Sequence, residues 1–576
     1  MRVKYPRTPH LPWSPGATAD DVRLVDLRAL EGREVVVTEK LDGENTTLYR
    51  DGLHARSLDS AHHPSRSRLK ALHGRVASQI PEGWRVCGEN VFARHSIEYR
   101  ALEGCFYAFS VWAAERCLSW DETVRFTTER LGVPTPRVLH RGIFDARALR
   151  KLKVERDRVE GYVVRLADGF AFADFEHSVA KWVRSEHVTT DAHWMQSDVV
   201  PNGLSDRAAL WEVRSGGASD VEGLLRALGI MDAPSEGAEI VAAHLDARGR
   251  RGDARLAGVL ACTLSSSDLR DEGRRSWLAP RLVAPLGMRL ARTVADLVGR
   301  RRAASWEVPD AARVAQLRRL ARGTGVAALA ALAHVATDPQ QAELFELFAD
   351  EAGVLREAPF EHLRAPLDAA LAGEDPDVRD HAWAAILERF TESKLQSPEE
   401  ALAIAHPMRR VLPPRLVITV GPSGSGKSTF ADRLGCPVIS LDRLRAARGD
   451  RADQSDNDAV LRRAVDLLEA AMRAGGQAVW DATALDPRQR GIPLRAARRH
   501  GALVTFAVFL APDEQVLEQN GAREHAVPDA IVRAQLARRV LPHAGEADRI
   551  LYIDARGEVA DISGSLDDRA HAELRA

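Results

Sequence analysis

The chain has few cysteines, no long apolar run and no recognisable leader. Its 576 residues include five cysteines: Cys87, Cys105, Cys117, Cys262 and Cys436. None of them forms a CxxC pair, which argues against a zinc site or a disulfide framework and favours a reducing compartment. The longest apolar run, at residues 325–336, is too short to span a bilayer, and the N-terminus lacks the apolar core of a signal peptide. These absences predict a cytoplasmic protein with no membrane partner.

The chain also lacks an excess of charge of one sign. Its formal net charge is −2, so any nucleic-acid groove has to be a local basic surface. Apolar residues make up 45% and charged residues 28% of the chain, which is typical of a globular protein. A chain of 576 residues is long enough for about three to four domains.

Three regions differ in their sequence patterns, and together they predict a multidomain protein. Residues 1–205 alternate short β-rich runs with turns, which indicates an α+β domain. Residues 206–405 show apolar residues at helical spacing and few strand signals, so an all-α middle domain is expected there. Residues 406–576 begin at a proline-marked break and continue as an α/β pattern. The clearest expected elements are strands at Glu34–Thr38, Phe106–Trp112, Gly161–Leu166, Arg415–Val420, Pro437–Ser440, Ala478–Trp480 and Leu503–Leu510, and helices at Ala311–Ala321, Pro339–Ala349, Val378–Phe390, Ser428–Leu434 and Asp458–Arg473.

The first chemical motif is a lysine in the segment Glu39–Asn45, within Lys40-Leu41-Asp42-Gly43. A lysine nucleophile has to be deprotonated, and burial together with nearby positive charge or metal favours the neutral amine. Such an amine can attack the α-phosphorus of ATP, with carboxylates nearby to hold a divalent metal. Taken alone, Lys-x-Asp-Gly is also a common turn, because Asp-Gly favours hairpins.

Further groups follow this lysine in a fixed order. They are Arg56, Glu89 in Gly88-Glu89-Asn90, Phe109 in an aromatic strand, Glu160 in Glu160-Gly161, and Lys181. The succession resembles the covalent nucleotidyltransferase superfamily. The opening Tyr5–Leu11 and the short spacing are most similar to RNA ligases of the T4 RNA ligase 2-like family.

That resemblance implies a role for each group. Lys40 would carry AMP, and Asn45 and Arg56 would contact the nucleotide or RNA ends, with Glu39 beside them in the nucleotide site. Glu89 and Glu160 would serve ribose binding and metal, with Glu160 as the metal ligand. Phe109 would stack on adenine, and Lys181 would touch the phosphates.

The resemblance has two departures and one further consequence. Ser110 stands where the family often has an acid, and Lys181 stands alone where the family often has Lys-x-Lys, with Arg184 as a compensating group. No five-strand pattern follows Lys181, whereas DNA ligases and capping enzymes usually append an OB-fold barrel there. This favours an RNA ligase over a DNA ligase.

The second motif is a phosphate-binding loop, Gly421-x4-Gly426-Lys427-Ser428, placed after a buried strand and before a helix. In this context backbone N–H groups and the helix N-terminus bind phosphates, Lys427 adds a charge and the Ser428 hydroxyl reaches Mg²⁺. The expected nucleotide-binding residues are Gly421, Ser423, Gly424, Ser425, Gly426, Lys427, Ser428 and Thr429. The motif predicts ATP or GTP binding and leaves the acceptor open.

Residues downstream of the P-loop indicate which kind of acceptor receives the phosphate. Asp442 at a strand end can accept a hydroxyl proton, and Arg445 can hold a substrate phosphate. Arg523 lies in a segment that looks like a lid. This set resembles the 5'-OH polynucleotide kinase domain of end-healing enzymes, which implies Asp442 as general base and Arg445 on the acceptor phosphate. Arg523 would then lie at the leaving phosphates.

Other downstream positions leave alternatives open. The family often has a second lid arginine where this chain has Gln519, so Arg488 or Arg490 would substitute or donor affinity would be weaker. Asp481 either orients Mg²⁺-bound water or caps a helix. Asp442 is alternatively a helix cap or a surface ion-pair partner.

The middle region carries no assignable catalytic motif. Arg248–Arg251 and Gly299–Arg302 are either solvated faces or an RNA-binding surface. His381 follows Asp380 in the wrong order for a metal phosphohydrolase, and His187-Val188-Thr189 is one copy of a motif that 2H phosphodiesterases need twice. We therefore find no candidate phosphatase and expect a separate 2',3'-phosphatase as partner.

The two motifs together predict a bifunctional RNA repair enzyme that uses ATP and Mg²⁺ or Mn²⁺. One module would phosphorylate 5'-OH RNA ends, and the other would seal the 5'-phosphate to a 3'-OH through a lysyl-AMP. Two alternatives remain open. One is a DNA-nick ligase fused to a small-molecule kinase, and the other is a catalytically degenerate RNA-binding scaffold.

Overall fold

A computed structural model describes most of the chain and divides it into two compact units, residues 1–263 and 264–576. The described residues are 2–18, 20–58, 63–155, 159–185, 199–231, 237–265, 271–300, 310–321, 329, 331–333, 339–355, 360–447, 457–543 and 545–566. The His187–Thr189 motif, the arginines at 301 and 302 and most of the apolar run at 325–336 lie outside this description.

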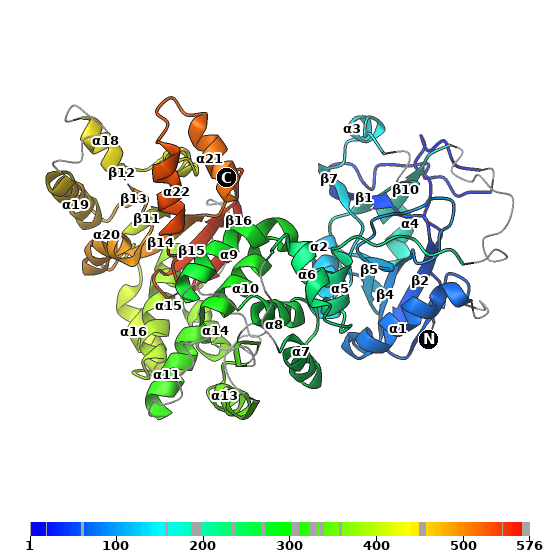
Figure 1. Ribbon diagram of the computed structural model, residues 1–576, viewed down its shortest axis with the longest axis horizontal. Helices are drawn as coiled ribbons and strands as arrows, with labels where there is room; N and C mark the ends of the chain where they lie inside the picture. Colours follow the sequence, from blue (N-terminus) through cyan, green and yellow to red (C-terminus); the bar gives the residue numbers. More distant parts are fainter. Residues whose placement is uncertain are drawn as a thin grey trace. The chain divides into compact units, whose positions relative to one another are not determined.

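The N-terminal unit is built on two antiparallel sheets (Figure 1). The four-stranded sheet has the order β10-β8-β1-β7 and the six-stranded sheet the order β3-β2-β4-β5-β6-β9. Their strands are β1 (Glu34–Lys40), β2 (Glu44–Tyr49), β3 (Gly52–Ala55), β4 (Trp84–Asn90), β5 (Phe106–Ala113), β6 (Arg116–Cys117), β7 (Val138–Ile143), β8 (Gly161–Leu166), β9 (Phe170–Ala171) and β10 (Val179–Val183). The short helices between them are η1 (Pro64–Arg66), α1 (Ser67–Val76), η2 (Ala77–Gln79), α2 (Trp120–Arg125), η3 (Phe126–Leu131), α3 (Ala146–Arg150), η4 (Phe172–Asp174) and α4 (Phe175–Ser178).

Strand register brings the predicted ligase residues to one place. Lys40 ends β1 opposite Gly161 on β8, so the carboxylate of Glu160 lies beside the lysine. A Cβ at Gly161 would lie 1.9 Å from the carbonyl oxygen of Trp182, so only glycine allows β10 to approach this closely. In the other sheet Asn45 pairs with Glu89. Motif residues that are far apart along the chain therefore lie close together between the two sheets.

Four helices complete the N-terminal unit after β10: α5 (Ala208–Arg214), α6 (Val221–Leu228), α7 (Ala238–Ala247) and α8 (Gly252–Thr263). Of these, α5 and α8 contact segments that flank the six-stranded sheet. The Trp211 indole donates to Glu103 at 2.8 Å, and a Cβ at Gly252 would lie 1.9 Å from the carbonyl oxygen of Glu129. Within the described residues 199–263 there is no β-strand beyond isolated bridges, in agreement with the lack of an OB-fold pattern.

The C-terminal unit contains a six-stranded sheet of order β12-β13-β11-β14-β15-β16, in which all pairs except β15–β16 are parallel. Its strands are β11 (Arg415–Val420), β12 (Val438–Ser440), β13 (Gln477–Asp481), β14 (Leu503–Phe509), β15 (Arg549–Ile553) and β16 (Val559–Gly564). The helices connecting them are α17 (Lys427–Arg433), α18 (Leu441–Ala446), α19 (Asn457–Arg473), α20 (Pro487–Arg499), α21 (Asp513–Gly521) and α22 (Asp529–Ala537). The nearly continuous burial of β11 and β14 explains why these strands read as uninterrupted apolar runs.

Helices from the middle region belong to the same unit as this sheet, and some of them pack on it (Figure 1). They are α9 (Asp271–Leu286), α10 (Met288–Arg300), α11 (Asp310–Ala321), α13 (Pro339–Glu351), α14 (Glu361–Ala370), α15 (Pro376–Thr391), α16 (Pro398–Ala405) and η6 (His406–Met408). Asp380 on α15 forms a buried ion pair with Arg549 on β15 at 2.8 Å. The Trp383 indole donates to the carbonyl of Ser565, and Leu503 and Leu566 share one apolar core with α14–α16.

The fold class expected from the sequence is confirmed: a sheet-rich N-terminal domain, a helical middle region and a C-terminal domain with a mostly parallel sheet. The expected strands and helices all occur within one or two residues of their observed ends. The domain boundaries after residues 205 and 405 stay predictions. The compact units divide the helical region near residue 263, because its first four helices pack on one sheet system and the remainder on the other.

A truncation experiment tests the boundary at 405. A fragment of residues 406–576 would leave Arg549 without Asp380 and expose Leu503 and Leu566. Breaking a buried pair of this kind costs about 3–5 kcal/mol. We expect this fragment to aggregate or melt well below a fragment of residues 264–576 in circular dichroism. Equal melting temperatures would show that the P-loop module is independent of the helices before it.

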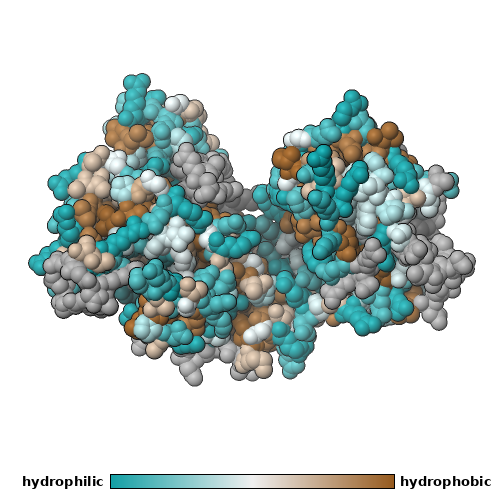
Figure 2. Space-filling model, turned by 90° about the horizontal axis from the view of Figure 1, so that it is seen from above, coloured by the Kyte–Doolittle hydropathy of each residue, from teal (hydrophilic) through white to brown (hydrophobic). Residues whose placement is uncertain are grey.

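No helix in the described ranges is long and apolar enough to cross a membrane. The face drawn in Figure 2 mixes hydrophilic and hydrophobic residues. All five cysteines are free.

Candidate active sites

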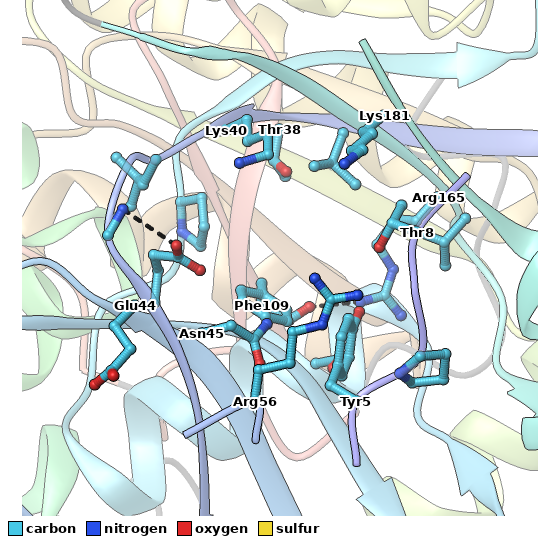
Figure 3. A pocket seen from close by; sticks show the side chains of 18 of the residues that line it. Tyr5, Thr8, Thr38, Lys40, Glu44, Asn45, Arg56, Phe109, Arg165 and Lys181 are labelled. Atoms are coloured by element: carbon cyan, nitrogen blue, oxygen red, sulfur yellow. Dashed lines mark hydrogen bonds between the residues drawn. The ribbon is translucent and has the colours of Figure 1, made fainter. Parts of the chain in front are cut away.

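A cavity of about 680 Å³ opens between the two sheets of the N-terminal unit (Figure 3). Seven of the residues expected from the sequence line it: Glu39, Lys40, Asn45, Arg56, Glu89, Phe109 and Lys181. Figure 3 shows Lys40 and Lys181 on one side of the cavity and Asn45, Arg56 and Tyr5 on the other. The Oδ1 atom of Asn45 is buried without a hydrogen-bond partner in the described structure, so the cavity offers an unused acceptor to a ligand hydroxyl.

Lys40, the last residue of β1, forms a close ion pair with Glu160, which directly precedes β8. Burial lowers the pKa of Lys40, but the carboxylates of Glu160 and Glu89 outweigh it, so the pKa is raised above that of an ordinary lysine. Burial also raises the pKa of Glu89 to about 8, although Lys40 opposes this shift. In this structure the carboxylates around Lys40 therefore favour its charged form.

This ion pair predicts a pH dependence for any reaction of the Lys40 amine. Because the pKa is raised, the neutral fraction is small at pH 7 and grows about tenfold per pH unit. The rate of nucleotide transfer to Lys40 should therefore rise between pH 7 and 9.

Glu160→Gln removes the main partner that raises the pKa. It should move the pH profile to lower pH while lowering the maximal rate. The measurement is label transfer from radiolabelled ATP to the protein. A profile with the same midpoint in wild type and variant would contradict the assignment.

Phe109 faces the cavity because β5 is irregular at this point. Ser110 pairs with Cys87 and Ala108 with Gly88, so Phe109 falls at a bulge. The next residue, Ser110, is buried, and its hydroxyl accepts a hydrogen bond from the Trp112 indole at 3.1 Å. The serine that replaces the family's frequent acid thus holds an aromatic side chain of the cavity wall.

Lys181 is the lysine of β10 that reaches the cavity, and burial lowers its pKa. Arg184, the expected compensating group, donates its backbone N–H to the carbonyl of Glu160 and does not line the cavity. The backbone of Lys181 is bonded on both sides to the N-terminal segment, through Pro9 and Leu11.

Sequence reasoning missed several cavity residues: Tyr5, Thr8, Thr38, Glu44, Arg66 and Arg165. Tyr5 packs edge-on to Phe109 with ring centroids 5.3 Å apart. Arg66 holds Glu44 through its guanidinium, and Arg165 donates to the carbonyl of Phe109 at 2.7 Å. Tyr5 and Thr8 belong to the opening segment Tyr5–Leu11, which the sequence analysis had singled out. No sequence motif around Arg66 indicates that it lines the cavity.

The second site lies at the carboxyl ends of the parallel strands in the C-terminal unit. The loop from Gly421 to Ser428 joins β11 to α17, and Gly426 caps the helix with φ +89°. A Cβ at Gly424 would lie 2.6 Å from the Cβ of Asn520, so α21 rests directly on the loop. Lys427 is buried, and its amine donates to the carbonyl of Pro422.

Acidic and basic groups converge on Lys427. Burial lowers its pKa to about 8, Asp481 and Asp442 act to raise it, and Arg523 acts to lower it. The Ser428 hydroxyl donates to Asp481 at 3.0 Å. The structure therefore brings together Lys427, Asp481, Asp442 and Arg523, four residues that the sequence analysis singled out.

Asp442 and Arg445 lie one helical turn apart on α18 and form an ion pair. Arg445 also donates to the side chain of Asn457 at 3.2 Å. Ser425 turns its hydroxyl to the carbonyl of Pro422, while Thr429 is exposed on α17. The ion pair keeps a candidate base and a candidate phosphate ligand at one edge of the sheet.

Arg490 is not a lid residue, because it is fully buried and bonded to Glu546 and to the carbonyls of Ala484 and Val540. Gln519 donates to the carbonyl of Ala555 at 3.2 Å and so anchors α21. Arg488 is exposed in the first turn of α20. A missed residue is Gln535 on α22, whose amide oxygen accepts the backbone N–H of Ser423 at 2.8 Å.

In the described part of the chain, no three His, Cys, Asp or Glu side chains are arranged to hold a metal ion. Mg²⁺ commonly uses one or two carboxylates and completes its shell with phosphate oxygens and water. Asp481 with Ser428 in one site, and Glu160 with Glu89 in the other, fit that pattern.

Comparison with protein families assigns both modules. Residues 33–183 match the model described as RNA ligase, and residues 416–542 match the model described as AAA domain. The chain thus joins an RNA ligase domain to a P-loop kinase-like domain. A search of the curated proteins finds no match.

Solved structures give similarities of low TM-score. A sugar kinase from Janibacter sp. HTCC2649 is 25% identical, with 25% of this chain and 87% of that chain covered and a TM-score of 0.21. A gluconokinase from Sinorhizobium meliloti 1021 is 21% identical, with 26% and 87% covered and the same TM-score of 0.21. An archaeal ATP-dependent RNA ligase is 16% identical, with 50% and 65% covered and a TM-score of 0.23. At these TM-scores the similarities carry no functional argument.

Proposed function

We propose that the protein repairs broken RNA by phosphorylating a 5'-OH end and then sealing it to a 3'-OH end. The observation that carries this proposal is the lysine of an RNA ligase domain, Lys40, which pairs with Glu160 and lines a cavity together with Phe109 and Lys181. A P-loop module in the same chain makes the 5'-phosphate that such a ligase consumes.

In the sealing module the Lys40 amine attacks the α-phosphorus of ATP. An N–P bond forms, the bond to pyrophosphate breaks, and the amine proton is lost to solvent. The RNA 5'-phosphate then displaces lysine from the AMP, and the 3'-hydroxyl displaces AMP to form the phosphodiester. Glu160 positions the amine before reaction, and Arg56 and Lys181 carry the positive charge that phosphates require.

In the phosphorylating module Asp442 takes the proton of the 5'-hydroxyl, whose oxygen attacks the γ-phosphorus while the nucleoside diphosphate leaves. Lys427 and Arg523 neutralise the phosphates, and Arg445 holds the phosphate next to the acceptor nucleoside. A divalent cation held by Asp481 and Ser428, or by Glu160 and Glu89, would supply charge neutralisation of the phosphates.

The rival function is sealing of nicked DNA with phosphorylation of a small molecule. To decide, wild-type protein is given ATP and Mg²⁺ with a broken RNA stem-loop carrying 5'-OH and 3'-OH ends, with the matching DNA, and with nucleosides or gluconate. We expect sealing of RNA, and phosphorylation of RNA in preference to the small molecules. Sealing of DNA alone, or phosphorylation of a small molecule alone, would replace the RNA-repair proposal.

A scaffold without chemistry is the second rival. The presence of Lys40, paired with Glu160 at the cavity, and of the buried Lys427 argues against it, because a buried lysine is costly unless it is used or paired. The absence of both protein adenylylation and phosphoryl transfer would favour the scaffold.

A further inference from the structure

Three arginines from two separate regions meet beside α1 in the N-terminal unit. Arg75 lies near the end of α1, Arg251 directly precedes α8, and Arg255 lies in the first turn of α8. Burial lowers the pKa of Arg251, and Arg255 and Arg75 act in the same direction while Asp246 opposes them. The Arg251 guanidinium is therefore close enough to those of Arg75 and Arg255 to be repelled by both.

The acidic partners in this cluster do not balance the arginines. Asp246 is shared between Arg251 and Arg255, and Glu212 contacts Arg75 at 3.0 Å. Arg250 precedes Arg251 in the chain, and its carbonyl accepts a hydrogen bond from the Arg251 guanidinium at 3.0 Å. The Nε–H groups of Arg75, Arg250 and Arg251 are buried and have no hydrogen-bond partner in the described structure. The guanidinium groups of the cluster thus carry positive charge that its two acidic partners do not balance, which suits a phosphate.

The local fold supports this cluster. Gly216, with φ +85°, leaves room for Arg251, since a Cβ there would lie 2.8 Å from its Nε. Gln79 donates to the carbonyl of Gly249 at 3.2 Å, which fixes the 248–251 turn against the end of α1. Arg75 donates to the hydroxyl of Ser215 at 3.3 Å. The 248–251 turn therefore stands beside α1, although about 170 residues separate them along the chain.

Helix α1 links the cluster to the ligase cavity. Arg66, one residue before α1, lines the cavity, and Arg68 is exposed in its first turn. Residues seven apart lie on nearly the same helix face, so Arg68 and Arg75 form one edge, while Lys70 lies on the opposite flank. From Arg66 to Arg75 the rise is roughly 13 Å, which corresponds to about four nucleotides of one strand.

We propose that Arg68, Arg75, Arg250 and Arg251 form a track that binds the backbone phosphates of the RNA strand whose end lies at Lys40. The inference rests on the proposed function for the substrate, because the end at Lys40 is an RNA end. It assigns a role to the Arg248–Arg251 motif, which neither catalytic site uses. Phosphate contacts position a strand without reading its sequence, so the track fits any RNA long enough to reach it.

The test compares Arg75→Ala/Arg251→Ala with wild type and with Lys70→Ala as the matched control on the other flank of α1. Without RNA, the transfer of AMP to Lys40 should be the same in all three proteins. The double variant should bind a 5'-phosphorylated RNA of about twelve nucleotides roughly tenfold more weakly. The slope of log affinity against log salt should fall by about 1.4, as expected for two lost phosphate contacts. A two-nucleotide RNA should bind equally well to all three.

A second variant guards against a folding defect. Glu212→Gln removes a competing carboxylate and should strengthen binding of the long RNA by roughly threefold at low salt, a gain that misfolding cannot produce. The inference is overturned if AMP transfer is normal but the double variant and Glu212→Gln both bind RNA like wild type. An equal loss with Lys70→Ala would also overturn it. If wild type itself transfers no AMP to Lys40, the proposed function fails instead, and RNA binding still reports on the track.

Discussion

Lys40→Ala should abolish transfer of AMP to the protein and with it all sealing, while phosphorylation of 5'-OH RNA continues at the wild-type rate. The loss should be on the order of 10³-fold or more, because no other side chain can take the place of a covalent nucleophile. Label from [α-³²P]ATP on the denatured protein measures the first effect. Accumulation of 5'-phosphorylated, unsealed RNA measures the second.

Lys40→Arg is the matched control for this result. Arginine keeps the positive charge that pairs with Glu160, and it cannot act as a nucleophile at neutral pH. We expect it to fold as wild type does, to retain RNA binding and to form no protein-AMP. Sealing by either variant at more than a few per cent of wild type would show that Lys40 is not the attachment site.

The reactivity of the Lys40 amine also depends on how the carboxylates around it are arranged. This arrangement could not be predicted from the sequence. The order Lys40, Glu89, Glu160 along the chain predicted one cluster, and antiparallel pairing of β1 with β8 and of β2 with β4 explains why it forms. The sign of the pKa shift of Lys40 was not predictable, because burial and the carboxylates act in opposite directions and only their distances decide.

Elements with a strong local pattern were predicted best. The strands Gly161–Leu166 and Arg415–Val420 have the ends that their apolar runs indicate, since both are bounded by glycine or proline-rich turns. Contacts between distant segments were not predictable. Gln535 accepts a hydrogen bond from the backbone N–H of Ser423 in the P-loop, 112 residues away along the chain. No sequence motif near Gln535 indicates this contact.

The helical region shows the same limit at a larger scale. Its helices were readable from the 3.6-residue period, but the period does not tell which sheet a helix covers. The partners Asp380 with Arg549 and Arg75 with Glu212 attach different parts of the region to different units. Such pairs can be read only from coordinates.

Lys427→Ala should abolish phosphorylation of 5'-OH RNA and leave sealing of 5'-phosphorylated RNA unchanged. Lys427 is buried at the phosphate loop, where burial lowers its pKa to about 8; bound phosphates would raise this pKa and keep the amine charged where it is most effective. Its loss should lower the rate by roughly 10²-fold or more. The measurement is transfer of label from [γ-³²P]ATP to the RNA 5' end.

Lys394→Ala is the control, since Lys394 is an exposed lysine of the same unit that pairs with Glu392. It should phosphorylate and seal as wild type does. If Lys427→Ala instead loses sealing of 5'-phosphorylated RNA, the two modules do not act in sequence as separate sites. If it keeps phosphorylation, another part of the chain binds the donor. If both expectations hold, each module performs one step, and the product of the P-loop module is the substrate of the Lys40 module.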